Sequence, residues 1–512
     1  MQAQARVKPK RIETLQRIIG RHDASRLVNR PASTCPHVRR SGIFGGSVNS
    51  KTPLREAFSD MNILSSLNPA TGDVLGEVLV TQTDKVQNSV DRARDAQLGW
   101  SALGLQGRAD ILGRAALIFS EREQKHARLM TREQGKPLKE SRAEAHGLGS
   151  RLEEEITEIV DALQPDIVEH GANRSTIYHD PLGVVGAITP WNFPMSMPNW
   201  MVLPSLMAGN TVVLKPSEET PLCGQAYADV LNEVLPKDVL IVVHGADEQG
   251  KALVHSDVDM IAFTGSREVG KHIMREASST LKRVVLELGG KDPMIVLEDA
   301  DIGRAAKFAA LNSFRNCGQV CISTERIFVM DSIADEFESA LTQLASALTV
   351  GDGLEGSDIG PMVNAQQREH VLTQIDEAVT AGATVLTGGD GNHKNFVTPA
   401  VITGVTEHMA IGTVETFGPV ACITRVASAD EAVARANDTR FGLGAVVFGG
   451  DEDQTESVAR RLTAGMIGVN RSPGGVPGTP WVGARESGFG FHKSKEGHRQ
   501  FTQTRVLTRT IR

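Results

Sequence analysis

The spacing of apolar residues alternates between two patterns from about residue 180 onward. Short apolar runs with the character of strands are Val184–Ile188, Thr211–Leu214, Val239–Val243, Met260–Phe263 and Val284–Leu288. Helical spacings, as in Gly224–Val234 and Arg267–Ser279, lie between these runs. Apolar strands that alternate with helices predict a parallel sheet with helices on both faces. This topology places ligands at the carboxyl ends of the strands.

A second alternating series begins at Pro293–Leu297 and ends near Asn470. It includes a helix with four apolar residues on one face, namely Phe337, Leu341, Leu344 and Leu348. A chain of 512 residues also exceeds the size of one ordinary hydrophobic core. The predicted fold class is therefore α/β, with two doubly wound-type α/β domains and a cleft between them.

The segment before these two series predicts a different arrangement. Residues 61–80 have the pattern of two short strands joined by a turn. Helices are predicted over the ranges that follow, namely a helix opened by Thr83-Asp84, Arg108–Phe119, Glu121–Gln134, Pro137–Gly147 and 151–163. The segment Ile167–Asp180 then predicts a strand or hairpin that projects from the body.

Residues 1–60 carry many arginines and lysines, few acidic residues and no sustained apolar period. Three interpretations stay open for this basic extension. It is a disordered tail, a reading frame whose real start is Met61, or a mitochondrial-type transit segment. Glu13 and Asp23 interrupt the basic pattern, so the first two interpretations are favoured over targeting.

The composition limits the classes of protein to which the chain can belong. With 40% hydrophobic and 23% charged residues, and no run near the ~18 apolar residues of a membrane helix, we expect a soluble chain without a membrane partner. A net charge of -8 gives no basic surface for nucleic acid. Five scattered cysteines do not predict a disulfide framework, so a cytoplasmic location is favoured. The partner is expected to be a small molecule.

Cys321 lies in the stretch Phe314–Val329, between a turn that contains Gly318 and a strand-like run. A cysteine on a short loop against a strand can expose its sulfur while the backbone stays rigid, as a nucleophile requires. A buried cysteine is more often a small core residue, and Cys321 alone favours that simpler interpretation.

Two further segments have candidate chemistry. Asn192 lies in TPWNFP, between bulky residues and prolines, and an amide fixed in this way suits an oxyanion hole. Glu287 ends an apolar strand before Gly289-Gly290, where a carboxylate that is costly to bury can act as a proton acceptor. A packing corner and a solvated strand end are the alternatives.

Two loops have the character of a nucleotide site. In AFTGSREVGKH a strand runs into a turn and a helix, so that Gly265 admits a phosphate, Ser266 caps the helix and Gly270 allows close packing. In VVLKPSEETP, Lys215 and Glu218 follow a strand end where a ribose would lie. A structural junction and an exposed ion pair are the alternatives.

Six motifs occur together and in order, namely TPWNFP, GNTVVLKPSEETP, FTGSREVG, LELGGKDP, GQVC and ETFGPV. Through these six motifs the chain resembles the NAD(P)-dependent aldehyde dehydrogenase superfamily, from about Asn68 to the C-terminus. The resemblance implies that Cys321 is the nucleophile, that Asn192 and the backbone N–H of Cys321 form the oxyanion hole, and that Glu287 is the general base. It implies cofactor contacts by Lys215, Glu218, Gly265, Ser266, Gly270, Trp191, Glu415 and Phe417. No metal is implied, and Cys317 is interpreted as structural.

One motif departs from the family pattern, because the segment Pro480–Gly488 reads PWVGARESG. The resemblance implies that Trp481 lies near the substrate tunnel and that Met197 and Trp200 line its other side. Walls of this kind favour an apolar aldehyde body. The pair His244-Gly245 replaces a usual Pro-Gly, with no evident consequence.

The resemblance also implies an NAD-binding domain (61–159 and 182–288), a catalytic domain (289–485) and a small β oligomerisation extension (160–181 and 486–512). A homodimer or homotetramer is expected. The predicted reaction oxidises an aldehyde to a carboxylic acid, with NAD preferred and NADP as the alternative. Glu287 argues against a coenzyme-A-acylating enzyme, and the intact set of Cys321, Asn192 and Glu287 argues against a catalytically inactive relative.

Overall fold

The first of two parallel sheets follows the predicted alternation closely. The computed structural model describes residues 62–391 and 394–511, so the interpretations of residues 1–60 lie outside it. This sheet has the order β18-β9-β8-β5-β6-β7. Its strands are β5 (Val184–Ile188), β6 (Thr211–Lys215), β7 (Leu240–Val242), β8 (Met260–Thr264), β9 (Arg283–Glu287) and β18 (Gly488–Phe489). All neighbours are parallel except β18, which runs antiparallel to β9.

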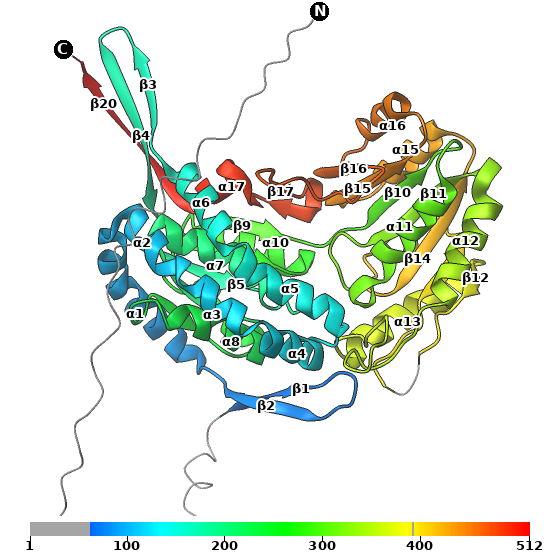
Figure 1. Ribbon diagram of the computed structural model, residues 1–512, viewed down its shortest axis with the longest axis horizontal. Coiled ribbons are helices and arrows are strands. Elements are labelled where there is room, and N and C mark those ends of the chain that lie inside the picture. Colours follow the sequence, from blue (N-terminus) through cyan, green and yellow to red (C-terminus); the bar gives the residue numbers. More distant parts are fainter. Residues whose placement is uncertain (1–61, 392–393, 512) are drawn as a thin grey trace, which may run out of the picture. The chain divides into compact units, whose positions relative to one another are not determined.

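Helices cover both faces of this sheet (Figure 1). They are α1 (Thr83–Ala102), α7 (Ser196–Ala208), α8 (Pro221–Asn232), α9 (Asp247–His255) and α10 (Arg267–Ser278). Val185 and Ala187 of β5 pack into one apolar cluster and Val184 packs into another. Successive side chains of a strand point to opposite faces, so the two clusters are the two covered faces of one sheet.

The second sheet has the order β12-β13-β14-β11-β10-β15-β16. Its strands are β10 (Asp292–Val296), β11 (Thr324–Met330), β12 (Thr384–Thr387), β13 (Ala400–Thr403), β14 (Val420–Val426), β15 (Gly444–Phe448) and β16 (Met466–Val469). Only β12 is antiparallel to its neighbour. Its helices are α11 (Ile302–Phe314), α12 (Ala334–Ser346), α13 (Ala365–Thr380), α15 (Ala429–Asn437) and α16 (Glu452–Ala459). The prediction of two wound α/β assemblies is confirmed.

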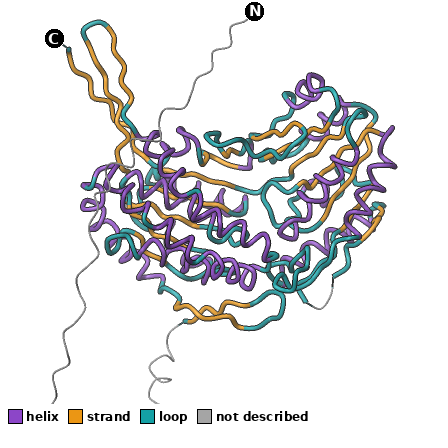
Figure 2. The backbone as a smooth tube through the Cα atoms, viewed as in Figure 1, coloured by secondary structure: helices purple, strands orange, loops and turns teal. Residues whose placement is uncertain are grey.

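A small third sheet projects from the helices as an arm, which is plain in the tube view (Figure 2). It has the order β20-β4-β3, from β3 (Asp166–His170), β4 (Asn173–Pro181) and β20 (Thr502–Thr510). The predicted projecting hairpin is therefore present, and the C-terminal strand joins it. Gly488-Phe489 belongs to the first sheet, so the segment 486–512 contributes to the first and third sheets. The domain boundaries given above stay predictions.

Further elements precede the first sheet in the chain. They are the hairpin β1 (Ile63–Leu67) and β2 (Val74–Leu79) and the helices α2 (Gly104–Gly113), α3 (Ala115–Glu121), α4 (Glu123–Gln134), α5 (Leu138–Ser150) and α6 (Leu152–Leu163). The helix predicted over Arg108–Phe119 is observed as two helices that meet at Arg114. Across the described part of the chain, no helix is long and apolar enough to cross a membrane.

Candidate active site

One cavity of about 1570 Å³ collects most of the predicted site residues. Its walls include Trp191, Asn192, Met197, Trp200, Gly265, Ser266, Glu287, Cys321, Glu415, Phe417 and Trp481. Lys215, Glu218 and Gly270 are not among the residues that line it. In the first sheet the contributing loops follow the carboxyl ends of β5, β8 and β9, as predicted. In the second sheet Cys321 and Glu415 precede β11 and β14, so its amino ends face the cavity.

Cys321 is held by a tight turn. Asn316 and Cys317 of the short 3₁₀ helix η1 (Arg315–Gly318) have left-handed backbone angles, with φ of 51° and 57°, and Gly318 follows with φ of 69°. A Cβ on Gly318 would collide with the carbonyl of Gly418, so only glycine fits. The turn leaves Cys321 half-buried in the cavity wall.

Cys317 points elsewhere and is fully buried in the core of the second sheet. Its Sγ lies 3.5 Å from Met362 Sδ. This placement agrees with the interpretation of Cys317 as a structural residue. The described residues contain no group of three or more His, Cys, Asp and Glu placed to hold a metal ion.

The thiol of Cys321 is in an environment that disfavours its ionised form. Burial raises the pKa of Cys321, and the nearby carboxyl groups of Glu287, Asp292 and Glu415 raise it further. Arg315 lowers it by a smaller amount. The resting thiol is therefore protonated at neutral pH, and a base must accept its proton before it can attack a carbonyl carbon.

Asn192 is buried and its amide is fixed at every atom but one N–H. Its Nδ2 donates to the carbonyl of Gln319 (3.0 Å), and its Oδ1 accepts from the N–H of Phe193 (3.1 Å). Because Gln319 lies two residues before Cys321, the amide is fastened to the nucleophile's own loop. The second N–H of Nδ2 is free to donate to an oxyanion formed beside Cys321.

Lys136 and Glu144 support this amide, and the sequence interpretation missed both. Lys136 Nζ donates to the carbonyl of Asn192 (2.6 Å) and to Glu144 Oε2 (2.7 Å). Glu144 Oε1 accepts from the N–H groups of Met195 (3.2 Å) and Ser196 (3.0 Å), just before α7. The pair is buried, and it connects the loop after β5 to α5. The only sequence signal is a carboxylate on the face of α5 that also carries Ala145 and Leu148.

Glu287 ends β9 and is buried, with 4% of its surface exposed. The Trp481 side chain and the backbone N–H of His492 hydrogen bond to its carboxylate, while Oε1 has no partner. Burial outweighs these two bonds and raises the pKa of Glu287 well above its usual range. A buried carboxyl group with a raised pKa and one free oxygen suits proton transfer. Trp481 therefore contacts this carboxylate as well as lining the cavity.

The turn before α10 has the features expected of a phosphate site. Ser266 caps the helix, with its Oγ accepting from the N–H of Val269 (3.4 Å). A Cβ on Gly270 would collide with Leu288, so glycine lets α10 pack against the end of β9. The hydroxyl of Thr264 is buried at the cavity without a partner. These groups fit the pyrophosphate of a dinucleotide.

Lys215 and Glu218 lie beyond the cavity, at the end of β6. Lys215 Nζ is 3.4 Å from Glu218 Oε2 and 3.0 Å from the carbonyl of Pro216. Burial lowers the pKa of Lys215. His244 of the His244-Gly245 pair lies near Lys215. Burial lowers the pKa of His244 to about 4, and the charge of Lys215 contributes to this shift. His244 Nε2 lies 2.8 Å from Gln225 Oε1.

Glu415 and Phe417 close the cavity on the side of the second sheet. Glu415 Oε1 accepts from the N–H of Gly290 (2.9 Å), and burial raises the pKa of Glu415 to about 8. A Cβ on Gly289 would collide with the Glu415 carboxylate. The Phe417 ring packs edge-on against Trp191 at 5.5 Å, and its N–H donates to Glu325 (2.9 Å).

Two further tryptophans line the cavity and pack against each other. The rings of Trp200 and Trp481 lie 5.2 Å apart at 62°. Lys493 Nζ lies 4.1 Å from the centre of the Trp200 ring, and Met197 lines the same cavity. The sequence interpretation missed Lys493.

Residues 57–507 match the family model described as the aldehyde dehydrogenase family. The chain belongs to the aldehyde dehydrogenase family. Its relatives include enzymes named as NAD-dependent and as NADP-dependent, and it is an NAD(P)-dependent aldehyde dehydrogenase by this membership. The family resemblance drawn from the six motifs is confirmed.

Three relatives illustrate the similarity. A probable succinate-semialdehyde dehydrogenase [NADP(+)] of Sinorhizobium fredii is 37% identical over 457 residues, covering 86% of this chain and 92% of that protein. A betaine aldehyde dehydrogenase of the same organism is 36% identical over 454 residues, covering 87% and 93%. A solved structure of PnpE in complex with nicotinamide adenine dinucleotide is 32% identical, with a TM-score of 0.85 over 88% of this chain and 94% of that one.

Proposed function

We propose that this aldehyde dehydrogenase oxidises an aldehyde to a carboxylic acid with NAD⁺ through a thioester on Cys321, which water then hydrolyses. One observation carries the proposal. A half-buried thiol, a fixed amide with a free N–H and a buried carboxyl group with a free oxygen line the same cavity. These are the nucleophile, the oxyanion donor and the base that acyl chemistry requires.

In the first step the Cys321 sulfur attacks the carbonyl carbon of the aldehyde and forms a thiohemiacetal. The thiol proton is lost to solvent through the cavity, so this step does not need the Glu287 carboxylate. The negative charge that develops on the carbonyl oxygen is stabilised by the Asn192 amide and the N–H of Cys321. The cofactor, when bound, would supply the hydride acceptor for the oxidation of this thiohemiacetal to a thioester on Cys321.

In the second step Glu287 removes a proton from water, and the hydroxyl adds to the thioester carbon. The tetrahedral adduct breaks its bond to sulfur and releases the carboxylic acid, and the proton held by Glu287 goes to the departing sulfur of Cys321. The Trp481 and His492 donors hold one side of the Glu287 carboxylate, which leaves Oε1 for the water. A coenzyme-A-acylating enzyme would deliver a thiol in place of this water and would not need Glu287.

The cofactor preference proposed is NAD over NADP. Glu218 is partly exposed at the end of β6, beside Lys215, where a ribose would lie. A carboxylate there can accept from the ribose hydroxyls but repels a 2′-phosphate. Relatives named as NAD-dependent and as NADP-dependent both belong to the family, so the proposal rests on Glu218.

The arm supports a homodimer or homotetramer. Both edge strands, β20 and β3, are unpaired on one side within the described residues, and they expose Ile167, Val168, Val506 and Leu507. Open strand edges with apolar residues readily pair with another chain. A cytoplasmic location is proposed from the cysteine usage, since the four described cysteines are free.

The test is NADH formation with a panel of aldehydes, with and without coenzyme A, for the wild type and Cys321→Ala. We expect NADH without coenzyme A in the wild type and none in Cys321→Ala, which should still bind NAD. Turnover that requires coenzyme A would replace the hydrolytic reaction with the acylating one. Absence of turnover under both conditions would favour an inactive relative, and activity in Cys321→Ala would refute the nucleophile.

A further inference from the structure

Lys493 is connected to Glu287 through a series of aromatic contacts. The Trp481 side chain hydrogen bonds to Glu287 and packs against Trp200. The Lys493 ammonium lies over the Trp200 ring, 4.1 Å from its centre. Lys493 also lines the cavity. Cys321, the two tryptophans and Lys493 line one cavity, so the distal part of an aldehyde bound at Cys321 can lie along the tryptophans and reach Lys493.

The Trp200 face is where a cationic substrate would be attracted. The face of an indole ring is electron-rich and binds ammonium groups, and cages of such rings recognise quaternary ammonium ligands. Here the protein's own ammonium already lies over that face. A cationic aldehyde would meet an occupied ring and a like charge, whereas an anionic group would meet a cation.

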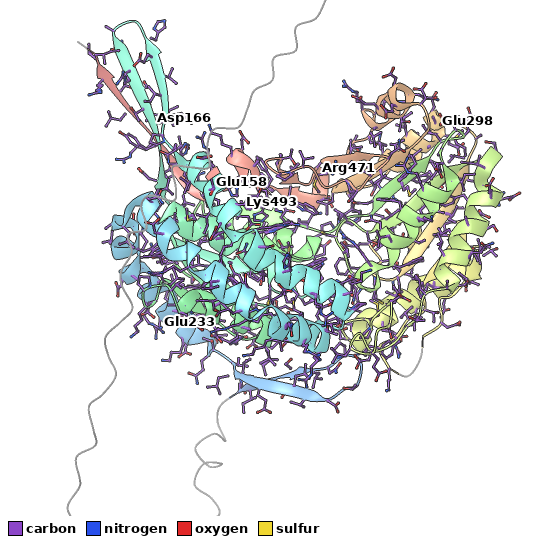
Figure 3. The ribbon with its side chains drawn as sticks, in the orientation of Figure 1. Glu158, Asp166, Glu233, Glu298, Arg471 and Lys493 are labelled. Atoms are coloured by element: carbon purple, nitrogen blue, oxygen red, sulfur yellow. The ribbon has the colours of Figure 1, made fainter. Side chains whose placement is uncertain are left out.

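The other charges around Lys493 come from α6 and from the turn before it. Glu155 and Glu158 of α6 and Arg151 all interact electrostatically with Lys493, and Glu158 lies beside it in Figure 3. Glu155 Oε2 accepts from Asn199 Nδ2 (2.8 Å). Among the described residues Lys493 has no salt bridge to either glutamate, so its ammonium stays available to a ligand.

Further cations line the same cavity. Arg142, Arg151 and Arg315 are in its wall, and the Nε of Arg315 is buried without a hydrogen-bond partner. The wall also carries acidic residues, namely Glu140, Glu144, Glu155, Glu287, Asp358 and Glu415. The cavity as a whole is therefore mixed in charge, and the selection for an anion rests on the Lys493 ammonium that lies over Trp200.

The backbone at Lys493 shows that this position is strained. Its φ of 58° with ψ of 177° lies in a region that glycine adopts readily and other residues rarely do. Strain of this kind persists where the surroundings hold a side chain in place, and such positions gather at functional sites. The strained residue here is Lys493, and its side chain lines the cavity.

We propose that Lys493 is a specificity-determining residue that selects aldehydes with an anionic distal group and rejects cationic ones. The proposal rests on the oxidation of aldehydes at Cys321 put forward above, and it adds the charge of the substrate. Relatives of this chain are named for aldehydes of both kinds, succinate semialdehyde and betaine aldehyde among them. Lys493 places this chain with the anionic kind.

The test compares kcat/KM for glutarate semialdehyde, pentanal and a trimethylammonium aldehyde of similar length. The wild type should prefer the anionic aldehyde and discriminate against the cationic one. Lys493→Met keeps the side chain's length and removes its charge, so the anionic-to-cationic ratio should fall about tenfold or more, the size of one lost charged contact. Lys495→Met is the matched control, because Lys495 is exposed two residues away and pairs with Asp166. It should leave the ratio unchanged.

A binding measurement keeps the two proposals separate. Glutarate and tetramethylammonium are titrated against the wild type and Lys493→Met, with tryptophan fluorescence as the readout, because Trp200 lies beside the ammonium. We expect glutarate to bind the wild type more tightly than the variant. Glutarate that binds both equally, a ratio unchanged in Lys493→Met, or a wild type that prefers the cationic aldehyde would overturn the role of Lys493. Absence of NADH with every aldehyde, together with Lys493-dependent glutarate binding, would instead overturn the proposed oxidation and support the anion selectivity.

Discussion

Lys136 Nζ lies 2.6 Å from the carbonyl oxygen of Asn192, and this contact fixes the peptide that carries the oxyanion-hole amide. Asn316 Nδ2 donates to the same carbonyl (3.1 Å), so two donors hold it. Glu144 neutralises Lys136 and binds the backbone that follows Asn192. The amide is therefore placed before any substrate arrives, as an oxyanion hole requires.

Replacing Lys136 with methionine should affect both catalysis and stability. Glu144 would be left as an unpaired buried charge, so the free energy of unfolding should fall by about 3–5 kcal/mol. The Asn192 peptide would lose a donor, and kcat should fall about tenfold or more because the amide is no longer aimed in advance. Denaturant unfolding and steady-state kinetics measure the two effects.

The double variant Lys136→Met with Glu144→Gln distinguishes the two effects. Removing both charges should restore part of the stability, since no unpaired ion remains, while kcat stays low. If kcat recovered together with stability, Lys136 would be a stabilising residue without a role in positioning Asn192.

The reactivity of Cys321 should depend on pH in a defined direction. Burial and nearby carboxylates raise the pKa of Cys321, so alkylation by iodoacetamide in the cofactor-free enzyme should increase through a midpoint above the usual thiol value of about 8.5. Glu415, whose own pKa is about 8, is negatively charged in that range. A negative neighbour disfavours the thiolate, so Glu415→Gln should move the midpoint to lower pH.

The alkylation rate is followed across pH, with mass spectrometry to locate the modified cysteine. The exposed acid Glu298, labelled in Figure 3, provides a control, because Glu298→Gln should leave the midpoint unchanged. A midpoint near neutral pH in the wild type, or a shift to higher pH in Glu415→Gln, would show that these charges do not govern the thiol.

Glu218 should decide between the two cofactors. Removing its carboxylate in Glu218→Thr takes away the repulsion of a 2′-phosphate and the acceptor for the ribose hydroxyls. The ratio of kcat/KM for NAD over NADP should fall about tenfold or more. Glu219→Gln, at the neighbouring carboxylate that bonds to Asn364, is the control. A wild type that already prefers NADP would contradict the assignment.

The arm should control the oligomeric state. Val506 and Leu507 are exposed on β20, an edge strand among the described residues, and charged residues on an edge oppose pairing with another strand. Val506→Lys with Leu507→Lys should therefore dissociate the oligomer, as measured by light scattering during size-exclusion chromatography. An unchanged mass would place the interface elsewhere.

The sequence predicted the sheets better than some of the helices. The five parallel strands of the first sheet were found because each is a short apolar run bounded by turns. Helix α7 was missed because it is apolar and buried nearly all round and contains Pro204, so no polar face reveals its period. Helix α9 has nine residues, too few for a clear periodic signal.

The candidate site shows the same limit. Cys321, Asn192 and Glu287 were predicted because each stands in a motif with distinctive glycines, prolines or strand ends. Lys136 and Glu144 were missed because their contact joins a loop to a helix eight residues later, and nothing local marks a buried ion pair. Lys493 was missed for a similar reason, because its role depends on Trp200, almost three hundred residues earlier in the chain.

The central claim is that a thioester forms on Cys321 and that Glu287 provides for its hydrolysis. The most direct measurement mixes Glu287→Gln with aldehyde and NAD⁺, quenches in acid and identifies the acylated peptide by mass spectrometry. Slow deacylation should produce a burst of about one NADH per active site and an acyl group on the peptide that contains Cys321. A burst without an acyl group on that peptide, or full steady-state turnover in the variant, would contradict the account.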